Sequence, residues 1–227
     1  MAFSLNQIVP WGRLRDEYEL MFDLSTHDFS AGVLDCGGGP ASFVAELTAN
    51  GHRAVAVDPI YAFSGEQIQA RFGVAEDLIL SQVRATPDDW VWSYHRDPDS
   101  LLANRRAALM KFLADYETGL RDRRYTIGEL PNLPFASGAF GLAVCSHLLF
   151  LYSDLLAEDF HIQAVRELCR VAHEVRIFPL LTHKRNPSPY LTAVRTTLDA
   201  DGWRSEVVRV NYEFQRGGNQ MLRLFRV

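Results

Sequence analysis

The stretch VLDCGGGPASF, residues Val33–Phe43, decides the fold: an apolar strand ends on a carboxylate and turns through three consecutive glycines into a helix. Glycine adopts positive φ without steric cost and lets a ligand approach the backbone. The unpaired N–H groups of the next helical turn point toward the same place, so the stretch is typical of a binding site for a small charged cofactor. Pro40 suits the first helical turn, where its missing donor costs nothing, and Gly51 indicates the helix end.

A second buried strand, Arg53–Val57, ends on Asp58, because Pro59 pushes the residue before it toward an extended conformation. Two strands joined by a short helix predict a right-handed parallel crossover. Further strands are predicted at residues 125–128, 141–145, 174–180, 205–212 and 220–227. The last two are joined through residues 216–219, a hairpin signal. The sequence therefore predicts an α/β, doubly wound, seven-stranded and mostly parallel sheet with an antiparallel C-terminal hairpin, in a single domain over residues 1–227.

Residues 61–124 do not continue this alternation. Helices are predicted at 64–80 and 100–120, with an aromatic stretch at 88–95 between them. We interpret residues 61–124 as a helical insertion that serves as a lid. Other helices are predicted at residues 10–24, 158–171 and 190–198.

Composition narrows the class of protein. At 48% hydrophobic and 22% charged residues, the 227-residue chain has ordinary globular values and can bury one substantial core. A net charge of −5 argues against general nucleic-acid affinity. Three cysteines far apart, without metal-ligand spacing, favour a reduced cytoplasmic protein with no metal site. The N-terminus lacks a secretory pattern, and the most apolar stretch, 142–152, falls short of the roughly 20 residues that span a bilayer. We expect a protein without a membrane partner.

Carboxylates stand at the ends of the first two predicted strands. In an open α/β sheet that edge is where ligands bind, and Asp58 there can accept both hydroxyls of a ribose. The alternative is that Asp58 only caps its strand. A dinucleotide fingerprint, G-x-G-x-x-G, would place its third glycine at Ser42. That fingerprint fails, and Asp35 before the turn suits an ammonium group better than a pyrophosphate.

Four stretches in order resemble motifs of the class I S-adenosylmethionine-dependent methyltransferases, of the methyltransferase type 11 kind. Val33–Ala41 is similar to the first motif, although Ala41 replaces the frequent last glycine. Val55–Asp58 is similar to the second motif, whose acidic residue holds the ribose hydroxyls. Gly128–Phe135 resembles the segment in which an acidic residue lies near the adenine amino group. Ser137–His147 resembles the fourth-strand motif, whose end approaches the methionine part of the cofactor.

The resemblance implies the Rossmann-like methyltransferase fold and S-adenosylmethionine as cofactor. Two departures concern Gly141, where many members carry an aspartate, and the strand at 174–180, which lacks the usual proline-glycine-glycine turn before it. Trp11, Arg13 and Tyr18 are candidates to close over the cofactor, and for Tyr18 the alternative is packing of the first helix. The cofactor-binding residues that the resemblance implies are Asp35, Gly37, Gly38, Gly39, Asp58, Pro59, Ile60, Glu129, Leu130 and Ser146.

Methyl transfer asks a protein mainly to align the acceptor and exclude water, and a base is needed only if the acceptor must lose a proton. His147, directly after the fourth strand, is the candidate base; the alternative is a histidine that supports the loop. A small-molecule acceptor is expected beneath the insertion, with Trp92, Tyr94, His95 and Tyr152 as candidate contacts. The insertion's aromatics can equally form its own small core.

Two other functions stay open. A non-catalytic module would bind S-adenosylmethionine without transferring its methyl group. A nicotinamide-dependent oxidoreductase would bind a dinucleotide instead, against which the glycine spacing argues.

Overall fold

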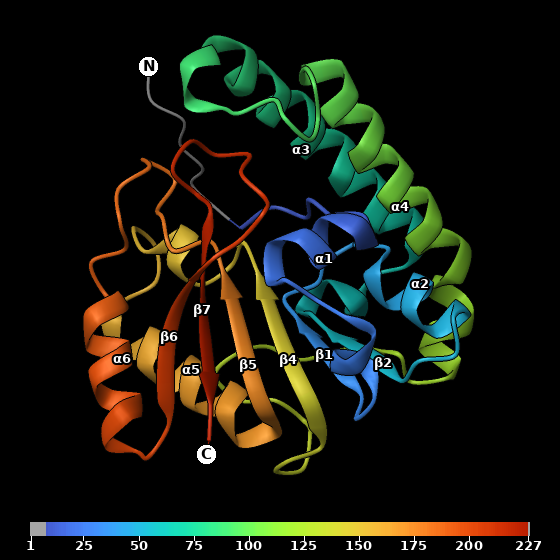
Figure 1. Cartoon of the computed structure of the whole chain (residues 1–227). Coiled ribbons are helices and arrows are strands. Elements are labelled where there is room, and N and C mark those ends of the chain that lie inside the picture. Colours follow the sequence, from blue (N-terminus) through green and yellow to red (C-terminus); the bar gives the residue numbers. More distant parts are fainter. Residues whose placement is uncertain (1–7, 227) are drawn as a thin grey trace.

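The computed structural model describes residues 8–226, and its strands form one seven-stranded sheet in the order β3-β2-β1-β4-β5-β7-β6 (Figure 1). Neighbouring strands from β3 to β5 pair in parallel, whereas β7 runs antiparallel to both β5 and β6. This confirms the predicted fold class, including the C-terminal hairpin. The strands are β1 (Val33–Cys36), β2 (Ala54–Val57), β3 (Tyr125–Thr126), β4 (Phe140–Ser146), β5 (Ala172–Phe178), β6 (Arg204–Arg209) and β7 (Gln220–Phe225).

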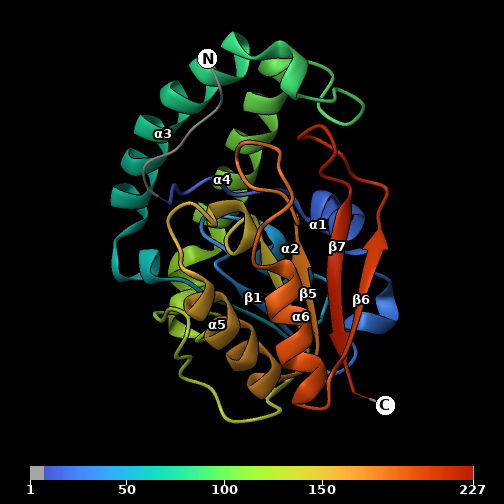
Figure 2. The same cartoon turned by 90° about the vertical axis from the view of Figure 1, so that its left-hand side faces the viewer.

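Helices cover both faces of the sheet (Figures 1 and 2). They are α1 (Arg15–Phe22), α2 (Phe43–Ala49), α3 (Gly65–Ala85), α4 (Pro98–Arg121), α5 (Glu158–Val171) and α6 (Leu191–Ala200). Successive strand residues point to opposite faces and so divide between two cores. In β4, Leu142 and Val144 pack with residues of α1, α2 and α4, whereas Ala143 and Cys145 pack with residues of α5 and α6. Burial on both faces explains why the central strands are almost continuously apolar.

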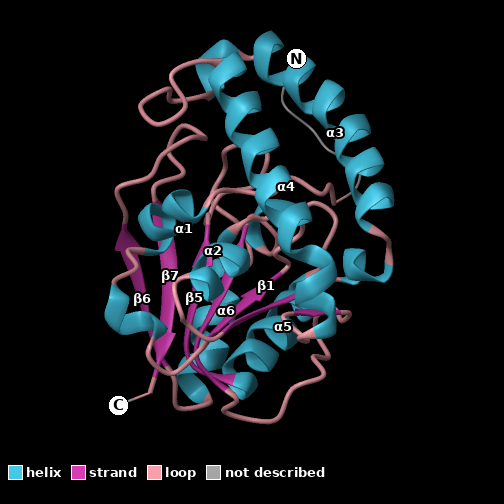
Figure 3. Cartoon of the chain, turned by 90° about the vertical axis from the view of Figure 1, so that its right-hand side faces the viewer, coloured by secondary structure: helices cyan, strands magenta, loops and turns pink. Residues whose placement is uncertain are grey.

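The segment between β2 and β3 contains the two longest helices, α3 and α4, which lie side by side at one end of the molecule (Figure 3). A separate cluster of Ala75, Ile79, Val83, Trp90 and Leu101 joins them. Farther along α4, Phe112 and Tyr116 enter the main core beneath the sheet. The insertion is therefore anchored at one end and reaches beyond the sheet at the other. None of the described helices has the length and apolar character needed to cross a membrane.

The observed ends of several elements differ from the predicted ones. The first helix covers Arg15–Phe22 rather than 10–24, because Leu14 is still extended and Asp23 takes a left-handed conformation. Before it the chain crosses the glycine turn so closely that a Cβ on Gly12 would lie 2.1 Å from the Pro40 carbonyl oxygen. Pro40 itself precedes helix α2 instead of occupying its first turn, since the helix begins at Phe43.

Candidate functional site

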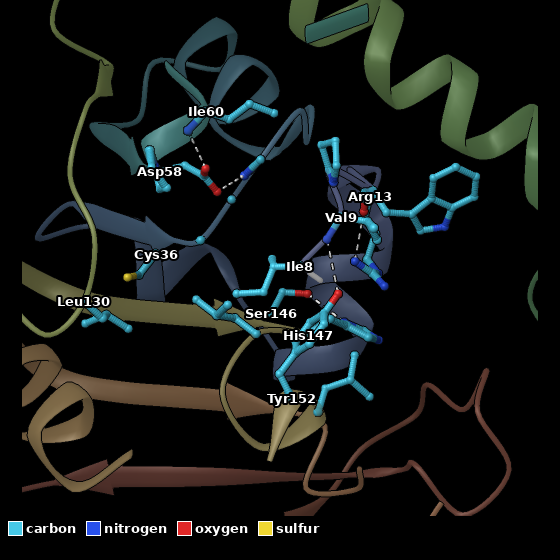
Figure 4. Close-up of a pocket in the computed structure, with 18 of the residues that line it drawn as sticks. Ile8, Val9, Arg13, Cys36, Asp58, Ile60, Leu130, Ser146, His147 and Tyr152 are labelled. Atoms are coloured by element: carbon cyan, nitrogen blue, oxygen red, sulfur yellow. Dashed lines mark hydrogen bonds between the residues drawn. The ribbon is translucent and has the colours of Figure 1, made fainter. Parts of the chain in front are cut away.

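A cavity of about 520 Å³ opens at the carboxyl ends of β1, β2 and β4, and residues of the N-terminal segment and of the insertion close it (Figure 4). This is the sheet edge at which the sequence predicts a ligand. The cavity brings together many residues that the resemblance implies for the cofactor. Those in its lining are Gly37, Gly38, Gly39, Asp58, Pro59, Ile60, Glu129, Leu130 and Ser146.

The glycine turn forms one wall of the cavity. Gly37 and Gly39 have φ of 72° and 53°, a region that side chains disfavour. A Cβ on Gly38 would lie 2.4 Å from the Asp35 carboxylate. The turn therefore exposes backbone, not side chains, to the cavity.

Asp58 lies at the end of β2 and reaches across to the glycine turn. Its carboxylate accepts hydrogen bonds from the backbone N–H groups of Gly39, at 3.0 Å, and Ile60, at 2.8 Å. Burial raises the pKa of Asp58 to about 6, against the lowering effect of these two bonds. Each carboxylate oxygen has a second lone pair, so Asp58 can still accept hydroxyl groups of a ligand.

Asp35 lies behind the turn and not in the cavity wall. Its side chain is only 1% exposed, and the Tyr18 hydroxyl donates to its two oxygens, at 3.1 and 3.3 Å. Burial raises the pKa of Asp35 to about 7, while the Tyr18 hydrogen bond lowers it. Tyr18 does line the cavity. The Asp35 carboxylate therefore lies behind the cavity wall, next to Gly38 and bonded to Tyr18.

His147 lines the cavity just after β4. It holds a left-handed φ of 52°, which costs energy in a residue other than glycine. Its Nδ1 lies 2.9 Å from the Ser146 hydroxyl, and its backbone N–H donates to the Phe178 carbonyl. Burial lowers the pKa of His147 well below its usual value, so the ring is neutral at pH 7. A neutral imidazole can accept a proton, and its role as a base stays a prediction.

Of the four residues predicted to contact the acceptor, one lines the cavity and three do not. Tyr152 lines the cavity, where its hydroxyl accepts a hydrogen bond from the N–H of Val9. Trp92, Tyr94 and His95 are outside the lining.

Each of these three residues makes structural contacts instead. Trp92 packs edge-on against Phe214, and the Tyr94 hydroxyl donates to Asp16. His95 is fully buried beside Glu17. Their contacts favour the alternative in which the insertion's aromatics serve packing.

The cavity also contains Trp90, an insertion aromatic for which the sequence left open an acceptor-pocket or a packing role, and Phe214, to which it assigned no role. Trp90 lines it and stacks on Phe214, with ring centroids 4.7 Å apart. No periodic pattern distinguishes Trp90 from Trp92 in this irregular segment, and Phe214 comes from the connection between β6 and β7. Both belong to the apolar part of the lining, here called the apolar chamber, which consists of Ile8, Val9, Trp11, Ile79, Val83, Trp90, Leu151, Leu156, Phe160 and Phe214.

Comparison with known proteins gives few relatives in sequence and many in fold. No family model matches the chain. The uncharacterized protein MJ0045 of Methanocaldococcus jannaschii is 28% identical over 220 residues, which cover 96% of each chain. Magnesium protoporphyrin IX methyltransferase from Synechocystis PCC 6803, solved with bound SAM, is 12% identical, with a TM-score of 0.43 over 87% of this chain and 70% of that one.

A putative S-adenosyl-L-methionine-dependent methyltransferase from Methanococcus maripaludis is 13% identical, with a TM-score of 0.45 over 94% of this chain and 83% of that one. Similarity at this level says nothing about a ligand of this chain. The strand order, the parallel crossovers and the antiparallel C-terminal pair are what identify the fold. The chain has the Rossmann-like fold of the class I S-adenosylmethionine-dependent methyltransferases.

Proposed function

We propose that the chain is an S-adenosylmethionine-dependent methyltransferase that acts on a small-molecule acceptor. One observation carries the proposal: a single cavity joins the glycine turn, the Asp58 carboxylate and the loop at Glu129 to an apolar chamber beneath the insertion. Its volume, about 520 Å³, falls within the range of roughly 300–1,000 Å³ that small-molecule sites occupy.

The residues present fit the cofactor. Asp58 keeps lone pairs for the ribose hydroxyls, and Gly38 leaves the backbone open to close approach. Ile60 and Leu130 supply apolar surface for adenine, and the exposed carboxylate of Glu129 can accept from its amino group. The same set of contacts is poorly suited to a dinucleotide, because buried Ser42 occupies the position of the third glycine.

The chamber fits an acceptor of limited polarity. Its walls are mainly apolar and aromatic, and two polar residues, His183 and Gln215, also belong to the lining. Such a mixture is typical of small-molecule sites, in which apolar surface gives affinity and a few polar groups fix orientation. S-adenosylmethionine supplies an already activated methyl group, so the chain's task is to align the acceptor and exclude water. Where the acceptor must lose a proton, neutral His147 is placed to accept it.

Calorimetric titration with S-adenosylmethionine and S-adenosylhomocysteine tests the cofactor site. The wild type should bind both, and Asp58→Asn should bind each roughly 10- to 100-fold more weakly, because hydrogen bonds to a charged group are lost. Asp97→Asn is the matched control. Asp97 also caps a helix by accepting a backbone N–H, from Ser100, but it lies outside the cavity lining. Its affinity should equal that of the wild type.

A folded wild-type protein that binds neither compound would refute the proposal. A rise in NADH fluorescence on titration would then indicate the oxidoreductase instead. To test transfer, methyl-labelled S-adenosylmethionine is incubated with a pooled extract of small molecules. Label should enter extractable products with the wild type and much less with Asp58→Asn. Binding without any transfer would indicate a non-catalytic module.

A further inference from the structure

Arg13 is a cation of the cavity lining that lacks a counter-ion among residues 8–226. It lies just before α1 and lines the cavity, where Figure 4 shows it near Ser146 and His147. Its Nη1 donates to the Trp11 carbonyl at 3.1 Å. Its Nε is buried without a hydrogen-bond partner among residues 8–226, and no carboxylate of that range forms an ion pair with it.

Arg13 is half-buried with its Nε shielded from solvent, whereas the two buried arginines of the described chain are neutralised. Arg105 pairs with Glu17, and Arg176 pairs with Asp28 and Glu174. A buried charge without a partner is costly, and a guanidinium cannot escape this cost by losing its proton. The arrangement around Arg13 is therefore incomplete without an anion.

The carboxylates near Arg13 are already engaged by other groups. Glu17 accepts from Arg105 and from the Tyr212 hydroxyl, and Asp35 accepts from Tyr18. The anion must therefore come from a ligand in the cavity.

The position of Arg13 indicates which part of a ligand it meets. Its charge acts on both Asp35 and His147, at the ends of β1 and β4. In Figure 4, Arg13 and His147 lie at one end of the site and Asp58 and Ile60 at the other. The nucleoside end belongs with Asp58, so Arg13 faces the opposite end of the cofactor. An α-amino acid carries one ammonium and one carboxylate group, and Asp35 and Arg13 offer the two complementary charges.

We propose that Arg13 binds the α-carboxylate of the methyl donor. Asp35 and Tyr18 lie on the side of the donor's ammonium group. This inference rests on the proposed function. The chain then recognises its donor as an amino acid as well as a nucleoside. Two parallel N–H···O bonds from the guanidinium to a carboxylate would also satisfy Nε, the donor that the described residues leave unpaired.

The experiment is a cycle of two proteins and two ligands, measured by calorimetry. The ligands are S-adenosylmethionine and decarboxylated S-adenosylmethionine, which differ only in the carboxylate. The wild type should prefer S-adenosylmethionine by roughly 10- to 100-fold, the effect of a hydrogen-bonded charge pair. Arg13→Gln should lose this preference by weakening the binding of S-adenosylmethionine alone. Arg13→Lys keeps the positive charge but loses the two parallel N–H donors, so it should show an intermediate preference. This variant also provides the test if Arg13→Gln does not fold.

Arg15→Gln is the matched control, because Arg15 pairs with Glu19 and lies outside the cavity lining. It should keep the wild-type preference. A preference that is unchanged in both Arg13 variants would overturn the inference while leaving the proposed function intact, and would indicate that Arg13 meets an anionic acceptor instead. Failure of the folded wild type to bind either ligand would overturn the proposed function as well.

Discussion

At the scale of single residues, the candidate site depends on Gly38, because a glycine has no side chain. Gly38 leaves room for the Asp35 carboxylate, which Tyr18 holds in place from the other side. The turn can therefore present backbone N–H groups to a ligand while a carboxylate lies directly behind them. His147, at the neighbouring strand end, keeps a strained left-handed backbone, as residues at binding sites often do.

We expect Gly38→Ala to damage both stability and binding. The new Cβ would lie 2.4 Å from the Asp35 oxygen, and the buried carboxylate has little room to move. Overpacking of this kind costs about 1–3 kcal/mol, which urea denaturation would measure, and calorimetry should show weaker binding of S-adenosylhomocysteine. Gly73→Ala is the control, because no atom lies within 4 Å of a Cβ at that position in helix α3. It should stabilise the protein by up to about 1 kcal/mol. Equal stability of the two variants would contradict this reading of the turn.

At the scale of elements, a buried polar cluster fastens the insertion to the rest of the fold. Arg105 of α4 pairs with Glu17 of α1, and both side chains are fully buried. Tyr212, after β6, donates to the same carboxylate at 2.8 Å, and His95 lies beside it. Three segments that are distant in sequence therefore meet at Glu17. The cluster therefore ties α4 to α1 and to the segment after β6.

Arg105→Ala should lower the free energy of unfolding by about 3–5 kcal/mol, since it leaves the Glu17 carboxylate buried without its cation. Urea denaturation of this variant and of Arg106→Ala provides the comparison. Arg106 is the next residue on the same helix, but it is exposed and pairs with Glu76, so its loss should cost less than about 1 kcal/mol. Similar denaturation midpoints for the two variants would show that the buried cluster contributes no more than a surface pair.

At the scale of the whole molecule, stability and ligand binding meet at one edge of the sheet. The two cores hold the strands from both faces, and at the strand ends the Asp35 carboxylate is buried and Asp58 is half-buried. Burial raises the pKa of both carboxyls, to about 7 and about 6. Ionising these two carboxyls in the folded protein therefore costs stability, a feature typical of functional sites.

The pH dependence of the free energy of unfolding should reveal the raised pKa of Asp35. The folded pKa of Asp35, about 7, lies above the ordinary value of 3.8, so folding favours the protonated carboxyl. Its stabilising effect is present at low pH and is lost as the pH rises through 7. As the pH falls from 8 to 5, the unfolding free energy of the wild type should therefore gain about 2–3 kcal/mol relative to Asp35→Asn, without cofactor.

Asp97→Asn serves as the comparison for that measurement. Hydrogen bonds from Ser100 lower the pKa of the exposed Asp97 carboxyl, so its titration lies below the window from pH 5 to 8. The wild type should gain nothing relative to this variant across the same range. A wild-type advantage over Asp35→Asn that stays constant from pH 5 to 8 would mean that Asp35 is ionised throughout.

The parts of the fold that could be predicted have local causes. The three glycines after an apolar strand, the alternation of strands with helices and the glycine-containing link in the tail follow from steric and periodic rules acting over a few residues. The helix Glu158–Val171 was predicted with the bounds that the structure shows. The late start of the first helix was not predicted. Gly12 lies against Pro40, and no local sequence pattern indicates this contact.

The sequence by itself determined the strand and helix order, the glycine turn and the acidic residues at the strand ends, since these depend on neighbours along the chain. Only the tertiary structure decided which of them reach the cavity. It placed Asp35 behind the turn, His95 against Glu17, and Trp90 and Arg13 in the lining. The physical reason is that burial and charge pairing depend on segments that meet only after folding, so a side chain's role follows from its distant partners.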